Sequence, residues 1–453
     1  MSYSVITIDQ ITNPDDRKTI DFLRSVADKC KKMLSDAGAT RYTGSVSRST
    51  NNEFNVDGNH FSLFRTQFAD GLSLTCYLGG KKGTASISSS LTEESNISSA
   101  VKDAIASANA AEDDPAWVVA PREDSKIFVS GNLDFDKDAL FNRFVEIMDT
   151  LKADYPLILM EQAITNHSRG CSLYFNSSGT EFISLSGAYG ADFMYSAHDG
   201  DNASSFVGAG YTLNTLDKPF IEVGFLAKSF ADTQKQIYTK PFKGKKIGRL
   251  IATPGLVNEL ISSALGNFAE DYSILNGTSI WLDKLGKKVA DDRLTVSYPT
   301  SDDRFVGGQA FTSEGFLTED YNIIDKGVLT NFDLSAYTAN KTGFNRAPNS
   351  GHNMIIENGT KSIDDMIKET SFGIFVARFS GGSPSINGDF SGVAKNSFLI
   401  EDGKLTNALS ETMISGNLAD LLNSIVDISS EQELDGSNII PYISFDGVTI
   451  SGE

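Results

Sequence analysis

Cysteine and histidine are both scarce in this chain of 453 residues, which contains three cysteines and four histidines. So few cysteines exclude a scaffold held together by disulfides, and any zinc site would have to be assembled from very few of its usual ligands. Cys30, Cys76 and Cys171 are isolated in apolar contexts, so we expect them to be buried, reduced thiols.

Positive charge is also in short supply. The 59 Asp and Glu residues outnumber the 39 Lys and Arg residues, giving a net charge of −20, and the basic cluster Lys243–Lys246 stands alone. This balance argues against nucleic acid as a direct partner, because phosphate binding needs a basic face. The chain has no run of 18 apolar residues and no basic segment leading into an apolar one at its start. We therefore expect no membrane span, no signal peptide and a cytoplasmic location.

The first half of the chain alternates helix-like and strand-like patterns. Apolar residues at spacings of three and four predict helices over residues 16–37, from Thr92 to a stop at Asp113-Asp114-Pro115, over 140–151 and over 219–238. Alternating runs separated by turn pairs such as Asp57-Gly58, Asp70-Gly71 and Gly79-Gly80 predict antiparallel hairpins. These runs are residues 41–47, 53–56, 60–68, 72–78, 84–90, 157–165, 171–176, 184–196 and 205–213, followed by a basic turn over 240–246.

The pattern changes near residue 240. A short strand over 250–253 and a helix over 254–268 come first, and glycine-rich turns and strands then follow with one helix, over 419–425. We predict an α+β fold with an N-terminal helix-plus-antiparallel-sheet domain and a β-rich C-terminal domain. The expected division is residues 1–120, a central α+β segment over 121–238 that packs with the first part, and residues 239–453.

Several motifs imitate functional sites without meeting their requirements. No two histidines lie within five residues of each other, as a zinc-binding helix requires, although a site gathered from distant residues stays open. The acids at 134, 136 and 138 resemble the start of a calcium loop, but alanine and valine stand where glycine and glutamate are needed, so we expect a helix cap. Ser99 with Lys102 and the Lys341-Thr342-Gly343 triplet match two β-lactamase motifs by coincidence, since Ser99 lies well inside a predicted helix.

A polar, glycine-flanked stretch over residues 380–390 is the most unusual segment. Glycines there allow close approach of the backbone to another chain. One interpretation is a β-bulge and a tight hairpin. The other is a strand edge that binds an extended peptide through main-chain hydrogen bonds, or that contacts a partner. Its candidate contact residues are Gly381, Gly382, Asn387, Gly388, Asp389 and Phe390.

Segments along nearly the whole chain resemble the TldD/PmbA family, which is related to peptidases and was once labelled as candidate modulators of DNA gyrase. The segments that carry the resemblance occur in the family's order. They are residues 70–86 with Glu112-Asp113-Asp114-Pro115, residues 279–286, Asp325-Lys326-Gly327-Val328-Leu329, residues 335–343, Asn387-Gly388-Asp389-Phe390-Ser391, residues 398–404 and residues 414–418.

This resemblance implies two branches. The TldD branch carries a His-Glu-x-x-x-His helix and a downstream cysteine that hold a catalytic metal, whereas the PmbA or TldE branch lacks them. Here the corresponding helix retains only Glu259, because Asn258 and Ser263 stand where the imidazoles would be, and no cysteine follows Cys171. Asn and Ser are poor zinc ligands, which places the chain in the PmbA/TldE branch with no metal of its own.

The resemblance further implies a non-catalytic subunit of a TldD/TldE-like metalloprotease that acts on unfolded peptides. Zinc would then belong to a TldD-type partner, and no cofactor to this chain. Two alternatives stay open: a homodimeric peptide-binding or scaffold protein, and a self-sufficient peptidase with an atypical site around Glu259. Neither a membrane nor a nucleic acid is expected as a partner.

Overall fold

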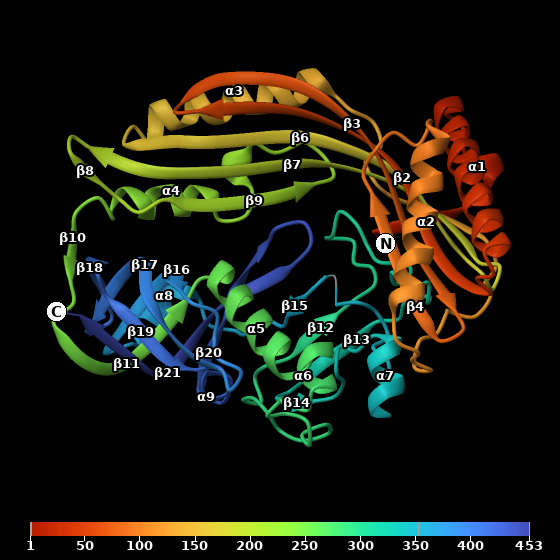
Figure 1. The fold of residues 1–453 in the computed structure, drawn as a ribbon. Coiled ribbons are helices and arrows are strands. Elements are labelled where there is room, and N and C mark those ends of the chain that lie inside the picture. The colour runs from red at the N-terminus through yellow and green to blue at the C-terminus, as the bar shows by residue number, and fades with distance from the viewer. Residues whose placement is uncertain (1, 352, 453) are drawn as a thin grey trace.

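The structure is a computed structural model that describes residues 2–351 and 353–452, so His352 lies outside the described residues. Within that range the strands form two sheets, one of nine strands and one of twelve. The first sheet arches over the second (Figure 1). The α+β fold class predicted from the sequence is confirmed, while the three-part division of the chain stays a prediction.

The first sheet is built from long antiparallel strands in the order β1-β5-β7-β6-β2-β3-β4, with β8 and β9 paired to β7. Its hairpins are continuous, since β2 pairs with β3 from Arg41↔Tyr77 to Asp57↔His60. The strands are β1 (Tyr3–Ile6), β2 (Arg41–Asp57), β3 (His60–Leu78), β4 (Lys81–Ile87), β5 (Lys126–Gly131), β6 (Ile158–Asn176), β7 (Glu181–Asp199), β8 (Asn202–Ala203) and β9 (Val207–Leu213).

Helices cover one face of this sheet. Alternate residues of β7, from Ile183 to Tyr195, are buried against helices, because side chains two apart on a strand share a face. The helices are α1 (Pro14–Asp36), α2 (Glu94–Ala110), α3 (Lys137–Asp154) and α4 (Leu226–Gln234), with short 3₁₀ turns at Ile8–Gln10 and Phe220–Glu222. The opposite face is turned toward the second sheet, and Phe128, Tyr174 and Phe182 on it contact Phe311.

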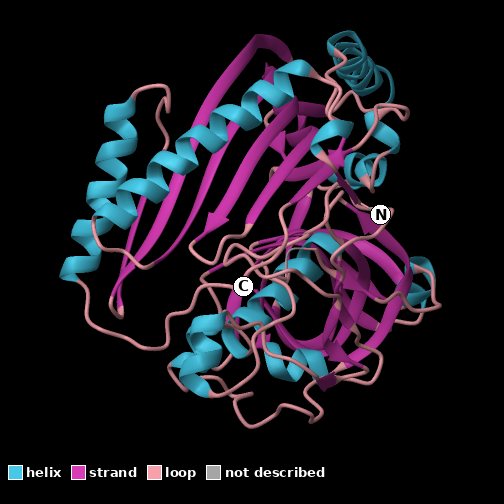
Figure 2. Cartoon of the chain, turned by 90° about the vertical axis from the view of Figure 1, so that its right-hand side faces the viewer, coloured by secondary structure: helices cyan, strands magenta, loops and turns pink. Residues whose placement is uncertain are grey.

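The second sheet curls into a ring. Strand β19 pairs with both β17 and β21, and this closes a circle through β16 and β11 (Figure 2). The strands are β10 (Thr239–Pro241), β11 (Gly244–Ala252), β12 (Val296–Tyr298), β13 (Tyr321–Asp325), β14 (Val328–Leu329), β15 (Ile355–Ile356), β16 (Phe372–Gly381), β17 (Asp389–Glu401), β18 (Lys404–Ser410), β19 (Met413–Asn417), β20 (Ile425–Leu434) and β21 (Ile439–Gly452). The helices are α5 (Pro254–Phe268), α6 (Asp271–Leu275), α7 (Ala336–Thr342), α8 (Ile363–Lys368) and α9 (Leu418–Asn423).

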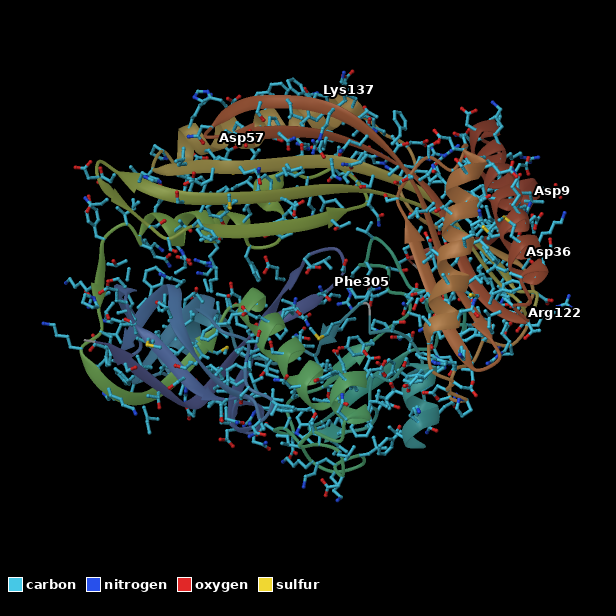
Figure 3. The ribbon with its side chains drawn as sticks, in the orientation of Figure 1. Asp9, Asp36, Asp57, Arg122, Lys137 and Phe305 are labelled. Carbon is cyan, nitrogen blue, oxygen red and sulfur yellow. The ribbon has the colours of Figure 1, made fainter. Side chains whose placement is uncertain are left out.

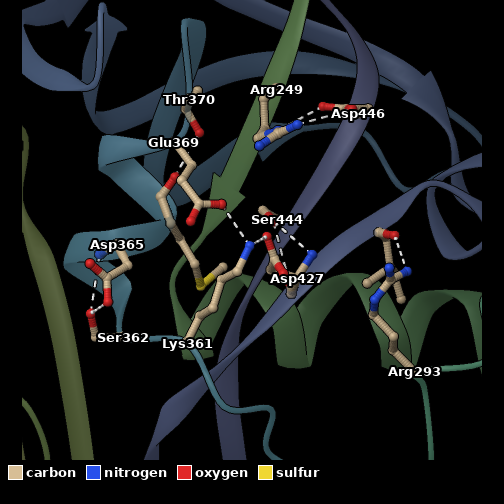
Figure 4. A network of polar contacts seen from close by, with 12 residues as sticks. Arg249, Arg293, Lys361, Ser362, Asp365, Glu369, Thr370, Asp427, Ser444 and Asp446 are labelled. Carbon is tan, nitrogen blue, oxygen red and sulfur yellow. Dashed lines mark hydrogen bonds and ion pairs between the residues drawn. The ribbon is translucent and has the colours of Figure 1, made fainter.

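Ion pairs connect α8 to the second sheet and join two strands within that sheet. Lys361, just before α8, binds Glu369 at 2.6 Å and Asp427 of β20 at 2.9 Å, while Arg249 of β11 binds Asp446 of β21 at 2.7 Å (Figure 4). Lys361 therefore bridges the two ends of α8 to a neighbouring strand. Such exposed pairs each contribute little energy, so their main effect is to orient α8.

A contact between α7 and the segment after α2 joins the two halves of the molecule. The ring of Tyr337 stacks on that of Trp117 with centroids 3.7 Å apart, and its hydroxyl donates to Asp114 at 2.9 Å. Lys341 also binds Asp114, at 2.8 Å. The hydrogen bond from Lys341 and the backbone N–H of Ala116 hold the pKa of Asp114 below its usual value.

Asp114→Ala is therefore expected to speed hydrogen exchange in α7 near neutral pH, because it removes both side-chain contacts from the joint. A carboxyl whose pKa is lowered in the folded state stabilises the fold only when it is ionised. The contribution of Asp114 is therefore present above about pH 4 and is lost as the pH falls through the folded-state pKa. Exchange followed by mass spectrometry measures this, with the exposed neighbour Asp113→Ala as the control. Equal hydrogen-exchange rates in α7 of the two variants would contradict a stabilising role for the Asp114 contacts.

The structure corrects several predicted boundaries. Asp70-Gly71 is not a turn but lies inside β3, because the Asp70 carboxylate binds Arg48 of β2 at 2.7 Å. The helix predicted over 219–238 is a 3₁₀ turn followed by the shorter α4, with Gly224 between them at φ +53°. Most of the predicted basic turn over 240–246 belongs to β10 and β11, and the short helices α6, α7 and α8 were not predicted.

Candidate functional site

Helix α5 carries the three positions singled out by the family motif. Pro254 occupies its first turn, and its buried face is apolar, with Leu256, Leu260 and Leu265 packed in the core. This pattern turns Glu259 and Ser263 to the other side of the helix, one turn apart. The helix was predicted with its observed bounds.

A cavity of about 310 Å³ lies between α5 and the loop that joins β16 to β17. Glu259 and Ser263 line it from the helix, and Gly381, Gly382 and Phe390 line it from the strands and loop. The structure thus brings together five residues that the sequence analysis placed in two separate segments. Asn258 is not among the lining residues, and its side-chain oxygen accepts a hydrogen bond from Ser262 at 3.4 Å.

The remaining candidate residues of the loop hold it in place. The Asn417 amide donates to the Asn387 carbonyl and to the Asp389 carboxylate, both at 2.9 Å. Gly388 adopts φ +89° and leaves no room for a side chain, because a Cβ there would lie 2.7 Å from the Phe268 ring. These residues anchor the loop and do not line the cavity.

Two further residues of this region were not found from the sequence. The Asn267 amide of α5 donates to the Ser385 carbonyl at 3.1 Å, which ties the helix to the loop. Phe379 of β16 lines the cavity and meets Phe390 edge to face, with centroids 5.8 Å apart. Neither residue lies in a motif, and both act across more than 10 positions of sequence, so no sequence signal marks them.

Glu259 is the titratable group of the cavity wall. Desolvation by the surrounding protein raises its pKa, and the positive charge of Arg378 lowers it in part. Arg378 itself reaches across to the first half of the chain, where its guanidinium donates to the Ser205 hydroxyl at 3.1 Å and lies 4.2 Å from the Phe206 ring centroid. The cavity wall is therefore coupled to the loop before β9.

One edge of β16 is open beside the cavity. Strand β11 pairs with β16 only from Arg249↔Gly373 to Ala252↔Val376, because α5 begins immediately afterwards. The Thr253 N–H then donates a hydrogen bond to the Val376 carbonyl, and the Thr253 hydroxyl donates one to the Ala377 carbonyl. In the described chain, the end of β16 beyond Ala377 pairs on its other side with β17 only. The backbone next to Gly381 is thus free to pair with an added strand.

The donors in this region do not fit a zinc ion. Among the described residues, no group of three or more His, Cys, Asp and Glu side chains is placed to hold a metal. His60, His167 and His198 lie on β3, β6 and β7 of the first sheet. The three cysteines are buried in that half as well, and burial raises the pKa of the Cys30 thiol to about 12, so it stays protonated.

Known proteins are similar to this chain both in its C-terminal domain and over most of its length. Residues 245–452 match the PmbA/TldA metallopeptidase C-terminal domain. The chain is 27% identical over 439 residues to metalloprotease PmbA of Escherichia coli O157:H7, covering 90% of this chain and 89% of that one. It is 25% identical over 404 residues to a PmbA homologue of Haemophilus influenzae, covering 84% and 85%.

Two solved structures share the fold over nearly the whole chain. TldE from Thermococcus kodakarensis superposes with a TM-score of 0.80 at 22% identity, covering 94% of this chain and 100% of that one. A candidate modulator of DNA gyrase from Bacteroides thetaiotaomicron gives 0.79 at 24% identity, with 95% and 99% covered. At these identities the likeness shows the fold alone.

The C-terminal half thus has the domain of a class of metallopeptidases, joined to an N-terminal sheet as in the solved relatives. Residues 245–452 carry the domain of the PmbA/TldA family model, and most of the chain is similar in sequence to PmbA proteins at 25–27% identity. In the described residues, no helix is long and apolar enough to cross a membrane.

Proposed function

We propose that this chain is a non-catalytic PmbA/TldE-type subunit that works with a metal-bearing TldD-type chain on unfolded peptides. One observation carries the proposal. The cavity beside α5 joins Glu259 and Ser263 to Gly381, Gly382 and the open edge of β16, yet supplies neither imidazole nor thiolate. This arrangement offers main-chain pairing to an extended peptide without the ligands that zinc requires.

The chemistry expected of these residues is binding and orientation. An extended segment beside β16 would add a strand to the sheet, and Phe379 and Phe390 would provide an apolar wall for its side chains. Glu259 sits at the same wall and would favour a peptide N–H or a basic side chain as neighbour. The hydrolysing water and its metal would belong to the TldD-type partner, with no zinc or other cofactor held by this chain.

The test combines metal content with peptide digestion. The purified chain alone is expected to carry no stoichiometric zinc and to leave an unfolded peptide intact, whereas addition of a TldD-type chain should give a co-purifying complex that digests it. Gly382→Val is expected to weaken peptide binding, because Gly382 lines the cavity and has open space for a side chain. Gly307→Val is the matched control, since it also has open space but lies outside the cavity.

A self-sufficient peptidase is the second candidate, and the raised pKa of Glu259 favours it, because a carboxyl of this kind is suited to act as a general base. Digestion by the chain alone that disappears in Glu259→Gln would establish this alternative and overturn the proposal. Peptide binding without any recovered partner would instead support the homodimeric binding or scaffold protein.

A further inference from the structure

A second cavity, of about 240 Å³, lies between the two halves of the molecule. Strand β9 and helix α4 of the first half line one side of it, and the start of α5 with β16 and β21 lines the other. In Figure 1, α4 and β9 lie above β16 and β17, and Figure 3 shows side chains from both halves in the space between them. We call this the α4–α5 cavity. It shares no lining residue with the cavity beside Glu259, so it is a separate site.

Aromatic rings form the apolar wall of the α4–α5 cavity. The ring centroid of Tyr442 lies 5.4 Å from that of Phe225 and 6.3 Å from that of Phe375, and all three residues line the cavity. Small-molecule sites typically combine such a wall with a few polar groups. The volume of about 240 Å³ equals roughly eight water molecules at about 30 Å³ each, which suits a ligand the size of an amino acid.

Polar side chains that are almost fully buried face this cavity without partners. Tyr442 is 3% exposed and Gln236 is 4% exposed. The Gln236 oxygen accepts a hydrogen bond from the Asn396 amide at 2.9 Å, which leaves the Gln236 amide nitrogen with no partner in the described chain. The Tyr442 hydroxyl and the Asn396 oxygen also have no hydrogen-bond partner among the described residues. Because buried polar groups in native proteins are nearly always paired, these groups point to a ligand.

Glu433 adds a carboxyl group that no basic side chain in the described residues neutralises. One of its oxygens accepts hydrogen bonds from the Tyr211 hydroxyl at 3.0 Å and the Phe225 N–H at 3.3 Å. Burial raises the pKa of Glu433. Burial and the charge of Glu433 raise the pKa of Tyr442, so the two groups lie in the same part of the cavity. A buried carboxylate without a positive partner is costly, and an ammonium group on a ligand would remove that cost.

The start of α5 supplies donors to the same cavity. Gly255, in the first turn of this 15-residue helix, lines the cavity, and no side chain caps the helix. The hydroxyl of the N-cap residue Thr253 donates to the Ala377 carbonyl instead, at 3.2 Å. Free N–H groups at a helix N-terminus attract a carboxylate, both as donors and through the helix dipole. With the unpaired Gln236 amide, they form the part of the wall that suits a negative group.

We propose that the α4–α5 cavity binds a free α-amino acid with an apolar side chain. The ammonium group of the ligand pairs with Glu433, and its carboxylate accepts hydrogen bonds from the start of α5 and from the Gln236 amide. Its side chain packs against the aromatic wall. Because these groups come from both halves of the chain, the bound amino acid joins α4 to α5. The site is independent of the proposed subunit role.

The first experiment identifies the ligand by calorimetric titration of the full chain after extensive dialysis. L-Leucine and L-phenylalanine are expected to bind. N-acetyl-L-leucine lacks the positive charge and L-leucinamide lacks the negative one, so each should bind about tenfold or more weakly. Tyr442→Phe should weaken L-leucine binding about tenfold, because it removes one hydrogen-bonding group. Tyr298→Phe is the matched control, since Tyr298 is also buried but lies outside the cavity. Absence of binding by both amino acids, or equal binding of the two derivatives, overturns the proposal.

The second experiment locates the ligand with two glycines of α5. A Cβ added at Gly255 meets no atom within 4 Å, so Gly255→Leu is expected to fill the cavity and abolish L-leucine binding without lowering stability in urea. Gly266→Leu is the matched control on the same helix, because its Cβ has only ordinary contacts, the nearest at 3.8 Å, and it lines the cavity beside Glu259. It is expected to bind L-leucine like the parent chain. Loss of binding in Gly266→Leu but not in Gly255→Leu would place the amino acid beside Glu259 and overturn the proposal, as would unchanged binding in both.

Discussion

Gly388→Ala is expected to lower the free energy of unfolding by about 2–4 kcal/mol, through backbone strain and overpacking together. Gly388 has φ +89°, a conformation that costs any residue with a Cβ. The added Cβ would also lie 2.7 Å from the Phe268 ring and 3.4 Å from the Leu418 backbone nitrogen. Phe268, the last residue of α5, is fully buried and packs on Trp281 with ring centroids 5.0 Å apart, which opposes its displacement. Urea unfolding followed by tryptophan fluorescence measures the loss.

Gly382→Ala is the matched control, because it lies in the same loop, has no left-handed φ and meets no atom within 4 Å. It is expected to unfold at the same urea concentration as the parent chain. Equal stability of the two variants would contradict the tight packing of Gly388. A large loss in both would show instead that the whole loop tolerates no side chain, which would count against the open cavity described above.

This pair of glycines illustrates what sequence reasoning can and cannot find. Both were picked from one polar stretch, and nothing in the sequence separates Gly382, which faces the cavity, from Gly388, which packs on α5. Their difference depends on Phe268, more than 100 residues earlier in the chain. The helix that carries Phe268 was predicted correctly, because its periodicity is local and Pro254 marks its start.

The long hairpins were harder to predict for the same reason. The turn signal at Asp70-Gly71 is strong locally, but Arg48 on the neighbouring strand neutralises Asp70 and keeps β3 extended. Likewise, the family motif placed Glu259 and Ser263 on one helix, Glu259 as the retained residue and Ser263 in place of an imidazole. The effect of the Arg378 charge on Glu259 arises only when β16 is placed beside α5. Long-range neighbours decided each of these cases.

Asp333→Asn is expected to raise the free energy of unfolding by about 2–4 kcal/mol near pH 8 and by clearly less near pH 5. Burial, with the charges of Glu270 and Asp271 nearby, raises the pKa of Asp333 to about 7. The backbone N–H of Asp333 donates a hydrogen bond to the carbonyl of Ala269, just after α5, at 2.9 Å. This bond holds Asp333 in place. At pH 8 the ionised carboxylate is therefore kept next to other acids in a poorly hydrated position.

The direction of the pH dependence follows from the raised pKa. The protonated form of Asp333 is the one that the fold favours, so its contribution to stability is complete below the ordinary pKa of about 4 and is lost as the pH rises through about 7. The parent chain should thus lose stability between these limits. The asparagine variant, which carries no charge and has nearly the same shape, should lose less over the same range.

Asp302→Asn provides a control of opposite sign. The hydrogen bond from Arg304, at 2.7 Å, lowers the pKa of Asp302, so its ionised form stabilises the fold and the substitution should weaken the chain at pH 8. Urea unfolding of the three chains near pH 5 and pH 8 distinguishes the effects. If Asp333→Asn gives the same gain at both values, the benefit comes from packing rather than charge. If Asp333→Asn gives no gain in the free energy of unfolding at pH 8, ionisation of Asp333 costs the fold nothing. Its burial and the nearby charges of Glu270 and Asp271 would then not destabilise the fold.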